Sequence, residues 1–163
     1  MKFLTHEQFQ QEIMQYKARL FRLARCIVKN EHDAQDAVCE AIYKAFRGLD
    51  SLKHSQAFGS WIYRITVNES NRILRKRKNM VDLEEARNVA AREEPGWQLT
   101  DYIVKLPEDL RVSVYLFYYE DLPMTEIARI AGIPLNTVKS RLRRAKEQLK
   151  RMIPAEEVLQ NGF

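Results

Sequence analysis

The segment over residues 124–152, MTEIARIAGIPLNTVKSRLRRAKEQLKRM, restricts the possible fold more than any other part of this sequence. Its apolar residues recur at helical spacing on both sides of a short Ala-Gly-Ile-Pro turn, and Gly132 can adopt the left-handed conformation that ends a helix. A short helix, a glycine-containing turn and a second helix predict a helix-turn-helix motif. We expect the second helix to turn one row of apolar residues to the core: Val138, Leu142, Ala145 and Leu149.

The second helix of this motif is strongly basic and carries Glu147 as its one acidic residue. In a helix-turn-helix, the second helix enters the DNA major groove with its N-terminal residues at the base edges. Asparagine pairs with adenine and arginine with guanine there, while other cations reach phosphates. A merely charged surface helix is the alternative. We expect this helix to bind duplex DNA through a set of outward residues: Asn136, Thr137, Lys139, Ser140, Arg141, Arg143 and Arg144.

Glycine and proline are scarce, with five of each in 163 residues, which favours long helices and few turns. We therefore predict an all-α fold of two small helical domains joined by a linker. Three further helices are expected over residues 7–29, from an N-cap at Asp33 to Gly48, and over residues 58–79. A polar loop is expected between the second and third of them, and Pro107 is expected at the start of a helix in the second domain.

The second expected helix has two different faces. Its buried side would contain Ala37, Val38 and Phe46 among other apolar residues. Its opposite side repeats charged residues at helical spacing: Asp33, Asp36, Glu40, Lys44 and Arg47. The acidic members of this side would repel nucleic acid, so a basic protein surface is the expected partner. An ordinary solvated face is the alternative.

The third expected helix carries a ridge of basic and amide side chains at steps of four and three residues. The ridge consists of Arg64, Asn68, Asn71, Arg75 and Lys78. Aromatic residues, including Trp61, stand at the start of the helix. Basic groups beside aromatic rings and amides suit single-stranded nucleic acid, whose bases offer faces and edges. For Trp61 alone, packing in the core is the alternative.

An acidic segment over residues 80–98 separates the two expected domains. Its periodicity is weak and it contains a Pro-Gly pair, so we interpret it as a linker, with another surface helix as the alternative. The domains would then cover residues 1–79 and 99–153, followed by a tail over residues 154–163.

The sequence gives no indication of catalysis or of a bound cofactor. Cys26, Cys39 and the three histidines show no metal-ligand spacing, and no carboxylate cluster or nucleophile with its base is visible. We expect no enzymatic activity, no metal and no cofactor. No signal peptide opens the chain and no apolar run approaches bilayer length, so we expect a cytoplasmic protein with reduced thiols and no membrane insertion.

Three stretches share a resemblance: DAQDAVCEAIYKAF, FGSWIYRITVNESNRILRKRK and MTEIARIAGIPLNTVKSRLRRAKEQL. In this order and spacing they resemble the extracytoplasmic-function (ECF) class of bacterial RNA polymerase sigma factors, over about residues 8–79 and 99–152. The resemblance implies a sigma factor that binds core polymerase and directs promoter-specific transcription initiation.

The resemblance also implies a role for each surface. The face with Asp33, Asp36 and Glu40, together with Lys44 and Arg47, would bind the clamp helices of the polymerase β′ subunit, and the second domain would dock on the β flap. The helix from Leu135 would read the −35 element. One non-template base of the −10 element would be captured outside the stack. The −10 element would be bound and opened by a set from the third helix and the loop before it: Lys53, His54, Gln56, Trp61, Arg64, Asn68, Asn71, Arg72, Arg75 and Lys78.

The chain departs from the family pattern at three places. Cys39 precedes Glu40 where a Gln-Glu pair is usual, which weakens one polymerase contact or replaces it with packing. Arg72 stands where Asp is common, so the charge near the −10 surface is higher. Pro134 occupies the cap position of the last helix, so a hydroxyl side chain cannot cap it. The family further implies an anti-sigma factor, often membrane-bound.

Two other functions remain as alternatives. A conventional helix-turn-helix regulator would bind duplex DNA without being a polymerase subunit, but it leaves the acidic face and the third helix without a role. An enzyme acting on nucleic acid would require a catalytic cluster of the kind that the sequence does not contain.

Overall fold

The structure is a computed structural model that describes residues 4–80 and 98–156. Within these residues it contains helices and no strand, which confirms the all-α prediction. The chain divides into two compact units, Met1–Val89 and Ala90–Phe163. The expected acidic linker lies outside the described residues except for Met80 and Gln98. None of the described helices is long and apolar enough to span a membrane.

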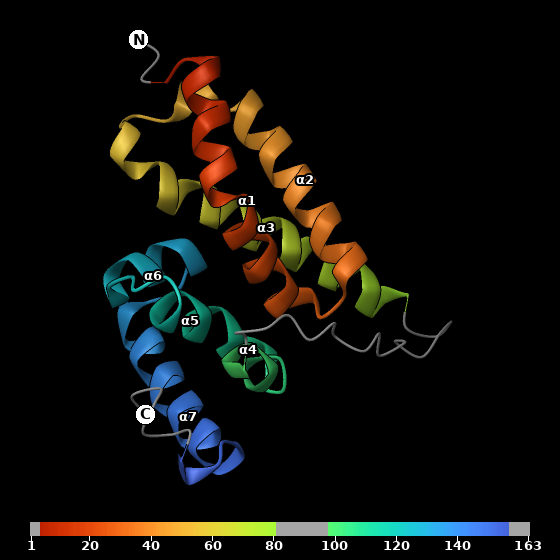
Figure 1. The fold of residues 1–163 in the computed structure, drawn as a ribbon, viewed down its shortest axis with the longest axis vertical. Coiled ribbons are helices and arrows are strands. Elements are labelled where there is room, and N and C mark those ends of the chain that lie inside the picture. The colour runs from red at the N-terminus through yellow and green to blue at the C-terminus, as the bar shows by residue number, and fades with distance from the viewer. Residues whose placement is uncertain (1–3, 81–97, 157–163) are drawn as a thin grey trace. The chain divides into compact units, whose positions relative to one another are not determined.

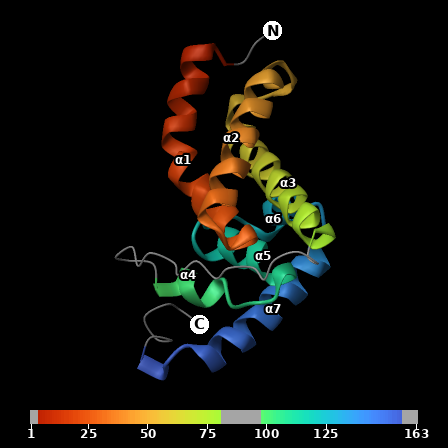
Figure 2. The ribbon, with the colours of Figure 1, turned by 90° about the vertical axis from the view of Figure 1, so that its right-hand side faces the viewer.

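The first unit is a bundle of three helices (Figures 1 and 2): α1 (His6–Val28), α2 (Glu31–Arg47) and α3 (Phe58–Asn79). Each of the three packs against the other two. The core between them is formed by fully buried apolar residues, including Leu20, Leu23, Ala37, Ala41 and Ile62. The predicted bounds of the third helix, residues 58–79, are confirmed.

The starts of α1 and α2 are set by side-chain caps. Thr5 and Gln8 form a reciprocal capping box, in which Gln8 N donates to Thr5 Oγ1 at 3.1 Å and Thr5 N donates to Gln8 Oε1 at 2.9 Å. At α2 the N-cap is Asn30, whose Oδ1 accepts from Asp33 N at 2.9 Å. The prediction of Asp33 as N-cap is therefore wrong. The extended backbone of Asn30 places its amide oxygen over the first turn, and Asp33 already lies within the helix.

The segment between α2 and α3 was expected to be a polar loop, but it contains two 3₁₀ turns, η1 (Leu49–Ser51) and η2 (Ser55–Ala57). Leu52 between them is buried, which anchors the loop to the bundle. Close packing continues at the start of α3, where a Cβ atom on Gly59 would lie 2.6 Å from Tyr16 Oη. Glycine at this position therefore allows α1 and α3 to approach each other.

Phe46 was expected in the core, but its side chain is 46% exposed. One side of its ring packs near Phe9 and His6, with centroid separations of 5.7 and 5.0 Å. The remaining part of the side chain is open to solvent. Phe46 thus marks the edge of the apolar face of α2 rather than its centre.

The second unit contains α4 (Gln98–Ile103), α5 (Glu108–Tyr118), α6 (Met124–Ala131) and α7 (Leu135–Met152). The three shorter helices all pack on α7, the blue helix of Figure 1. The short α4 was not predicted. Pro107 is the N-cap of α5 rather than its first helical residue.

Helices α6 and α7 form the predicted helix-turn-helix. Gly132 ends α6 in the left-handed conformation, with φ 67°. The inward row expected for α7 is confirmed, since Val138, Leu142, Ala145 and Leu149 are all buried. In α6, Ile127 and Ile130 are buried, while Ala128 and Ala131 are half-buried.

Candidate nucleic-acid and protein interfaces

The outward side of α7 presents polar and basic groups on a rigid helix. Its exposed members are Asn136, Lys139, Arg143 and Arg144. Thr137, Ser140 and Arg141 are half-buried, and Ser140 Oγ donates to the Thr137 carbonyl at 3.1 Å. The hydroxyl of Ser140 is thus directed to its own helix. The arrangement matches a recognition helix, with donors outward and an apolar row inward.

Pro134 is the N-cap of α7, and no side chain caps this end. The cap carbonyl of Pro134 accepts from Thr137 N at 3.0 Å, which begins the helical hydrogen bonding. The N–H groups of the first turn consequently have no side-chain acceptor, and together with the helix dipole they favour an anion such as a phosphate.

Arg144 has an acidic partner within its own unit. Its Nη2 atom lies 3.0 Å from Asp109 Oδ2, in the first turn of α5. Asp109 was not among the predicted functional residues. Its proximity to Arg144 arises from the packing of α5 on α7 and has no pattern in the sequence.

The ridge predicted on α3 is present. Arg64, Asn68, Arg75 and Lys78 are exposed, while Asn71 is half-buried. Trp61 at the start of the ridge is also half-buried, and its ring lies 5.9 Å from that of Phe58. Trp61 is therefore partly packed against the first unit and partly accessible to solvent. The loop residues Lys53, His54 and Gln56 are all exposed.

Within the predicted −10 set, Arg72 forms an ion pair with Glu69. Arg72 Nε donates to Glu69 Oε2 at 2.9 Å, and Lys44 of α2 binds Glu69 Oε1. The higher charge expected at Arg72 stays a prediction, and its guanidinium has a buried carboxylate as partner. The Glu69 side chain is 6% exposed.

The environment of Glu69 shifts its protonation. Burial alone raises the pKa of its carboxyl, but hydrogen bonds and charge from Lys44 and Arg72 outweigh burial, so that the pKa is lowered from its ordinary value. Glu69 is thus an anion that joins α2 to α3. Its role was missed because nothing in the local sequence distinguishes it from a solvated glutamate.

The charged face of α2 is only partly free. Asp36 is exposed and Glu40 is half-buried, so that a partner can reach both carboxylates. Asp33, however, has a side chain that is 14% exposed and lies against the guanidinium of Arg77 on α3. Its predicted outward position is therefore wrong, because it lies at the edge where α2 meets α3.

Lys44 and Arg47, the two basic members of this face, also contact their own chain. Lys44 binds Glu69, and Arg47 Nη1 donates to Tyr43 Oη at 3.3 Å with its guanidinium 5.8 Å from the centre of the Tyr43 ring. Asp36 and Glu40 are left as the acidic groups that a partner can reach.

A groove of about 470 Å³ runs between α2 and α3. Its two walls have opposite charge. The α2 wall is formed by Asp33, Asp36, Cys39 and Glu40, and the α3 wall by Arg72, Ile73 and Lys76. Cys39 and the buried Cys26 are both free thiols. Cys39 is exposed, so its thiol belongs to the surface of the groove and not to the core.

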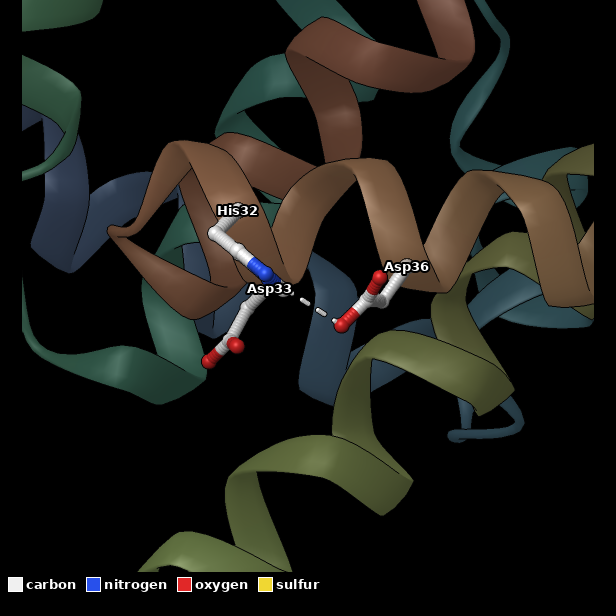
Figure 3. A group of neighbouring side chains, drawn as sticks. All are labelled: His32, Asp33 and Asp36. Atoms are coloured by element: carbon white, nitrogen blue, oxygen red, sulfur yellow. Dashed lines mark ion pairs between the residues drawn. The ribbon is translucent and has the colours of Figure 1, made fainter.

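His32, Asp33 and Asp36 lie together on the first turns of α2 (Figure 3), with potential ligand atoms within 4.8 Å of one another. No metal site was predicted at these residues. His32 Nδ1 lies 3.2 Å from Asp36 Oδ2, and Asp33 has Arg77 as its cationic partner. Both carboxylates of the group are therefore paired with cationic or imidazole side chains of the protein itself.

Comparison with known proteins gives a consistent result for both units. A Sigma-70 region 2 model matches residues 13–80, and a Sigma-70, region 4 model matches residues 97–149. The chain is 33% identical over 151 residues to RNA polymerase sigma factor SigV of Bacillus subtilis, covering 90% of this chain and 91% of SigV. It is 36% identical over 141 residues to the ECF RNA polymerase sigma-E factor of Escherichia coli K12, covering 72% of each chain.

A solved structure is also similar. The sigma factor RpoE from Bartonella quintana, determined in complex with the anti-sigma factor NepR, aligns with a TM-score of 0.74 and 25% identity. The alignment covers 88% of this chain and 94% of RpoE.

Proposed function

Because the chain belongs to the ECF sigma factors of bacterial RNA polymerase, we propose that it divides polymerase binding, −10 opening and −35 recognition among its three charged surfaces. A sigma factor directs promoter-specific initiation, and sigma factors are a non-enzymatic family. The alternative of a conventional duplex-binding regulator is not favoured, since a Sigma-70 region 2 match covers the unit that such a regulator leaves without a role.

The polymerase would be bound by the charged face of α2, through Asp33, Asp36, Glu40, Lys44 and Arg47. Within this set, Asp36 and Glu40 make the direct contacts, because Asp33, Lys44 and Arg47 have partners in the first unit, whereas Asp36 and its neighbour His32 are both exposed. The expected partner surface, the β′ clamp helices, would then be basic. The second unit would dock on the β flap.

The −10 element would be bound by the ridge of α3 and the loop before it. The exposed cations Arg64, Arg75 and Lys78 would follow the backbone, while Asn68 and Asn71 offer groups for base edges. Lys53, His54 and Gln56 with Trp61 would surround one extruded base. Arg72 contributes less charge than its position indicates, because Glu69 binds it.

The −35 element would be read by α7. Asn136, Thr137, Ser140, Arg143 and Arg144 would face base edges, and Lys139 and Arg141 would reach phosphates. The uncapped first turn that follows Pro134 supports a phosphate contact at the same end. The functional domains would correspond to residues 1–79 and 99–153.

The similarity to RpoE in complex with NepR supports an anti-sigma factor as a further partner. Such a partner would cover the surfaces that bind polymerase and DNA until a signal arrives. The site of action would be the cytoplasm, where core polymerase is found.

The observation that carries the proposal is that one Sigma-70 region matches each helical unit, and each unit has its own exposed charged helix face. The test is transcription in vitro with purified core polymerase and a library of promoter fragments. We expect new transcripts that depend on this chain and share two sequence elements. Duplex binding without any chain-dependent transcript would contradict the proposal and restore the conventional regulator.

For the assignment of α7, Arg144→Ala is expected to weaken selection at the −35 element and to leave binding to core polymerase intact. Unchanged −35 selection by this variant would remove Arg144 from the reading set.

A further inference from the structure

Arg144 stands apart from the other cations of α7. Within the part of the chain that the structure describes, it is the one basic side chain of this helix with an acidic partner at ion-pair distance. That partner, Asp109, comes from a different helix, 35 positions away in the sequence. Asp109 is thus a neighbour that the fold brings to the DNA-reading face.

We propose that Asp109 is a specificity-determining residue, whose carboxylate holds Arg144 away from phosphates and releases it to a matching base. The proposal rests on the −35 role of α7 put forward above. It assigns a function in DNA selection to α5, a helix outside the helix-turn-helix.

The geometry supports an ion pair between Asp109 and Arg144 that DNA can displace. The two side chains are 51% and 42% exposed, so that solvent screens their pairing and the contact is weak. A bidentate acceptor such as the O6 and N7 edge of guanine can therefore replace the carboxylate. A phosphate can also accept two hydrogen bonds from a guanidinium, but unlike the neutral guanine edge it is an anion and must approach the negative charge of Asp109.

The expected consequence is weaker binding to random duplex DNA relative to the correct site. A free arginine on this face would add one more phosphate contact on any duplex, and such contacts carry no sequence information. With Asp109 in place, that contact is suppressed on random DNA and the base contact is retained on the correct site. Removal of the carboxylate would therefore increase nonspecific affinity and reduce the specificity ratio together.

The first measurement is the salt dependence of full-length protein binding to a mixed-sequence duplex. Asp109→Asn is expected to raise the affinity about threefold and to steepen the slope of log affinity against log salt by about 0.9, the contribution of one phosphate contact. Asp109→Glu retains the charge and is expected to behave as the unmodified protein. Thermal unfolding of each variant verifies that the fold is retained.

Glu126→Gln is the matched control, because it removes the same charge from the same unit and also breaks a 3.0 Å pair with an arginine, Arg129. Equal effects of Asp109→Asn and Glu126→Gln would show that net charge alone is responsible and would overturn the proposal. The combination of Asp109→Asn with Arg144→Ala provides the second control. If Asp109→Asn still steepens the slope when Arg144 is absent, the carboxylate acts by direct repulsion of DNA and the proposal fails.

The second measurement uses holoenzyme and a promoter library randomised at the −35 element. Asp109→Asn is expected to broaden the selected sequences at the position that Arg144→Ala affects. If Arg144→Ala changes the selection but Asp109→Asn does not, the role of Asp109 is wrong and the proposed function stands. If Arg144→Ala itself leaves the selection unchanged, the −35 assignment of Arg144 is wrong, and the role of Asp109 fails with it.

Discussion

Arg72 Nε donates a 2.9 Å hydrogen bond to Glu69 Oε2 on the same helix, while Lys44 approaches the other oxygen of that carboxylate from α2. One buried anion therefore joins a residue of the proposed polymerase-binding face to a residue of the proposed −10 set. The Glu69 carboxylate thus lies beneath both proposed surfaces.

Glu69→Gln is expected to lower the free energy of unfolding by about 1–3 kcal/mol, because hydrogen bonds to two cations lose their charged acceptor. Denaturant unfolding of the full chain measures this change. Glu126→Gln, which breaks an exposed pair on α6, is the control, and its expected effect is below about 1 kcal/mol. An equal effect of the two substitutions would mean that the Glu69 contacts contribute no more than a surface pair.

Glu69 also predicts a dependence of stability on pH. Its pKa in the folded protein is lowered from the ordinary value of 4.5, which describes the unfolded chain. The ionised form is thus favoured by folding, and its contribution is complete above pH 4.5 and is lost as the pH falls through the lowered folded pKa. Unfolding measured from neutral to acidic pH is expected to show this loss in the unmodified protein. The same loss in Glu69→Gln would assign it to other groups.

The double substitution Asp36→Asn with Glu40→Gln is expected to weaken binding to core polymerase about tenfold or more, since each neutralised contact to a basic partner contributes on the order of 1 kcal/mol. Titration of labelled protein with core polymerase measures the affinity. Duplex binding by α7 is expected to remain unchanged. Glu7→Gln, an exposed glutamate on α1, controls for net charge, and an equal loss in this variant would argue against a specific face.

Arg75→Ala is expected to reduce binding to a single-stranded −10 fragment and to lower the slope of log affinity against log salt by about 0.7, as expected for one contact with single-stranded nucleic acid. Lys17→Ala removes an exposed cation from α1 and is the control. A slope that changes equally in both variants would contradict a localised contact at the ridge.

Gly59→Ala tests the approach of α1 to α3. The added Cβ would lie 2.6 Å from Tyr16 Oη, so that the substitution is expected to cost about 1–3 kcal/mol of stability. Tyr16→Phe removes that oxygen and is expected to recover most of the loss in the double variant. Additive effects in the double-mutant cycle would show that the contact is not the cause.

Much of the fold could be predicted from local periodicity. The bounds of α3 and the inward row of α7 follow from apolar spacing, because each of these helices has one clearly buried side. The cap of α2 was misassigned since Asn30 and Asp33 are both good capping residues, and only the backbone conformation distinguishes them. Phe46 was misplaced because it lies at the margin of the apolar side, where the neighbouring helices decide its exposure.

The positions of candidate site residues were predicted better than their partners. Asn68, Arg75 and Arg143 are exposed, as a helical wheel indicates. The pairing of Lys44 with Glu69 and of Arg144 with Asp109 joins residues 25 and 35 positions apart. Contacts of this kind depend on how helices pack and leave no periodic pattern in the chain, so that charges expected to be free were found to be partly neutralised.

The ion pairs between α2 and α3 occur at two levels, with Asp33 against Arg77 and Lys44 against Glu69. Two ion pairs at separate positions restrict sliding and rotation of α2 against α3 more than a single pair would. If α2 binds polymerase and α3 binds DNA as proposed, a displacement of α2 would accordingly be transmitted to the ridge of α3 as movement of a single rigid body.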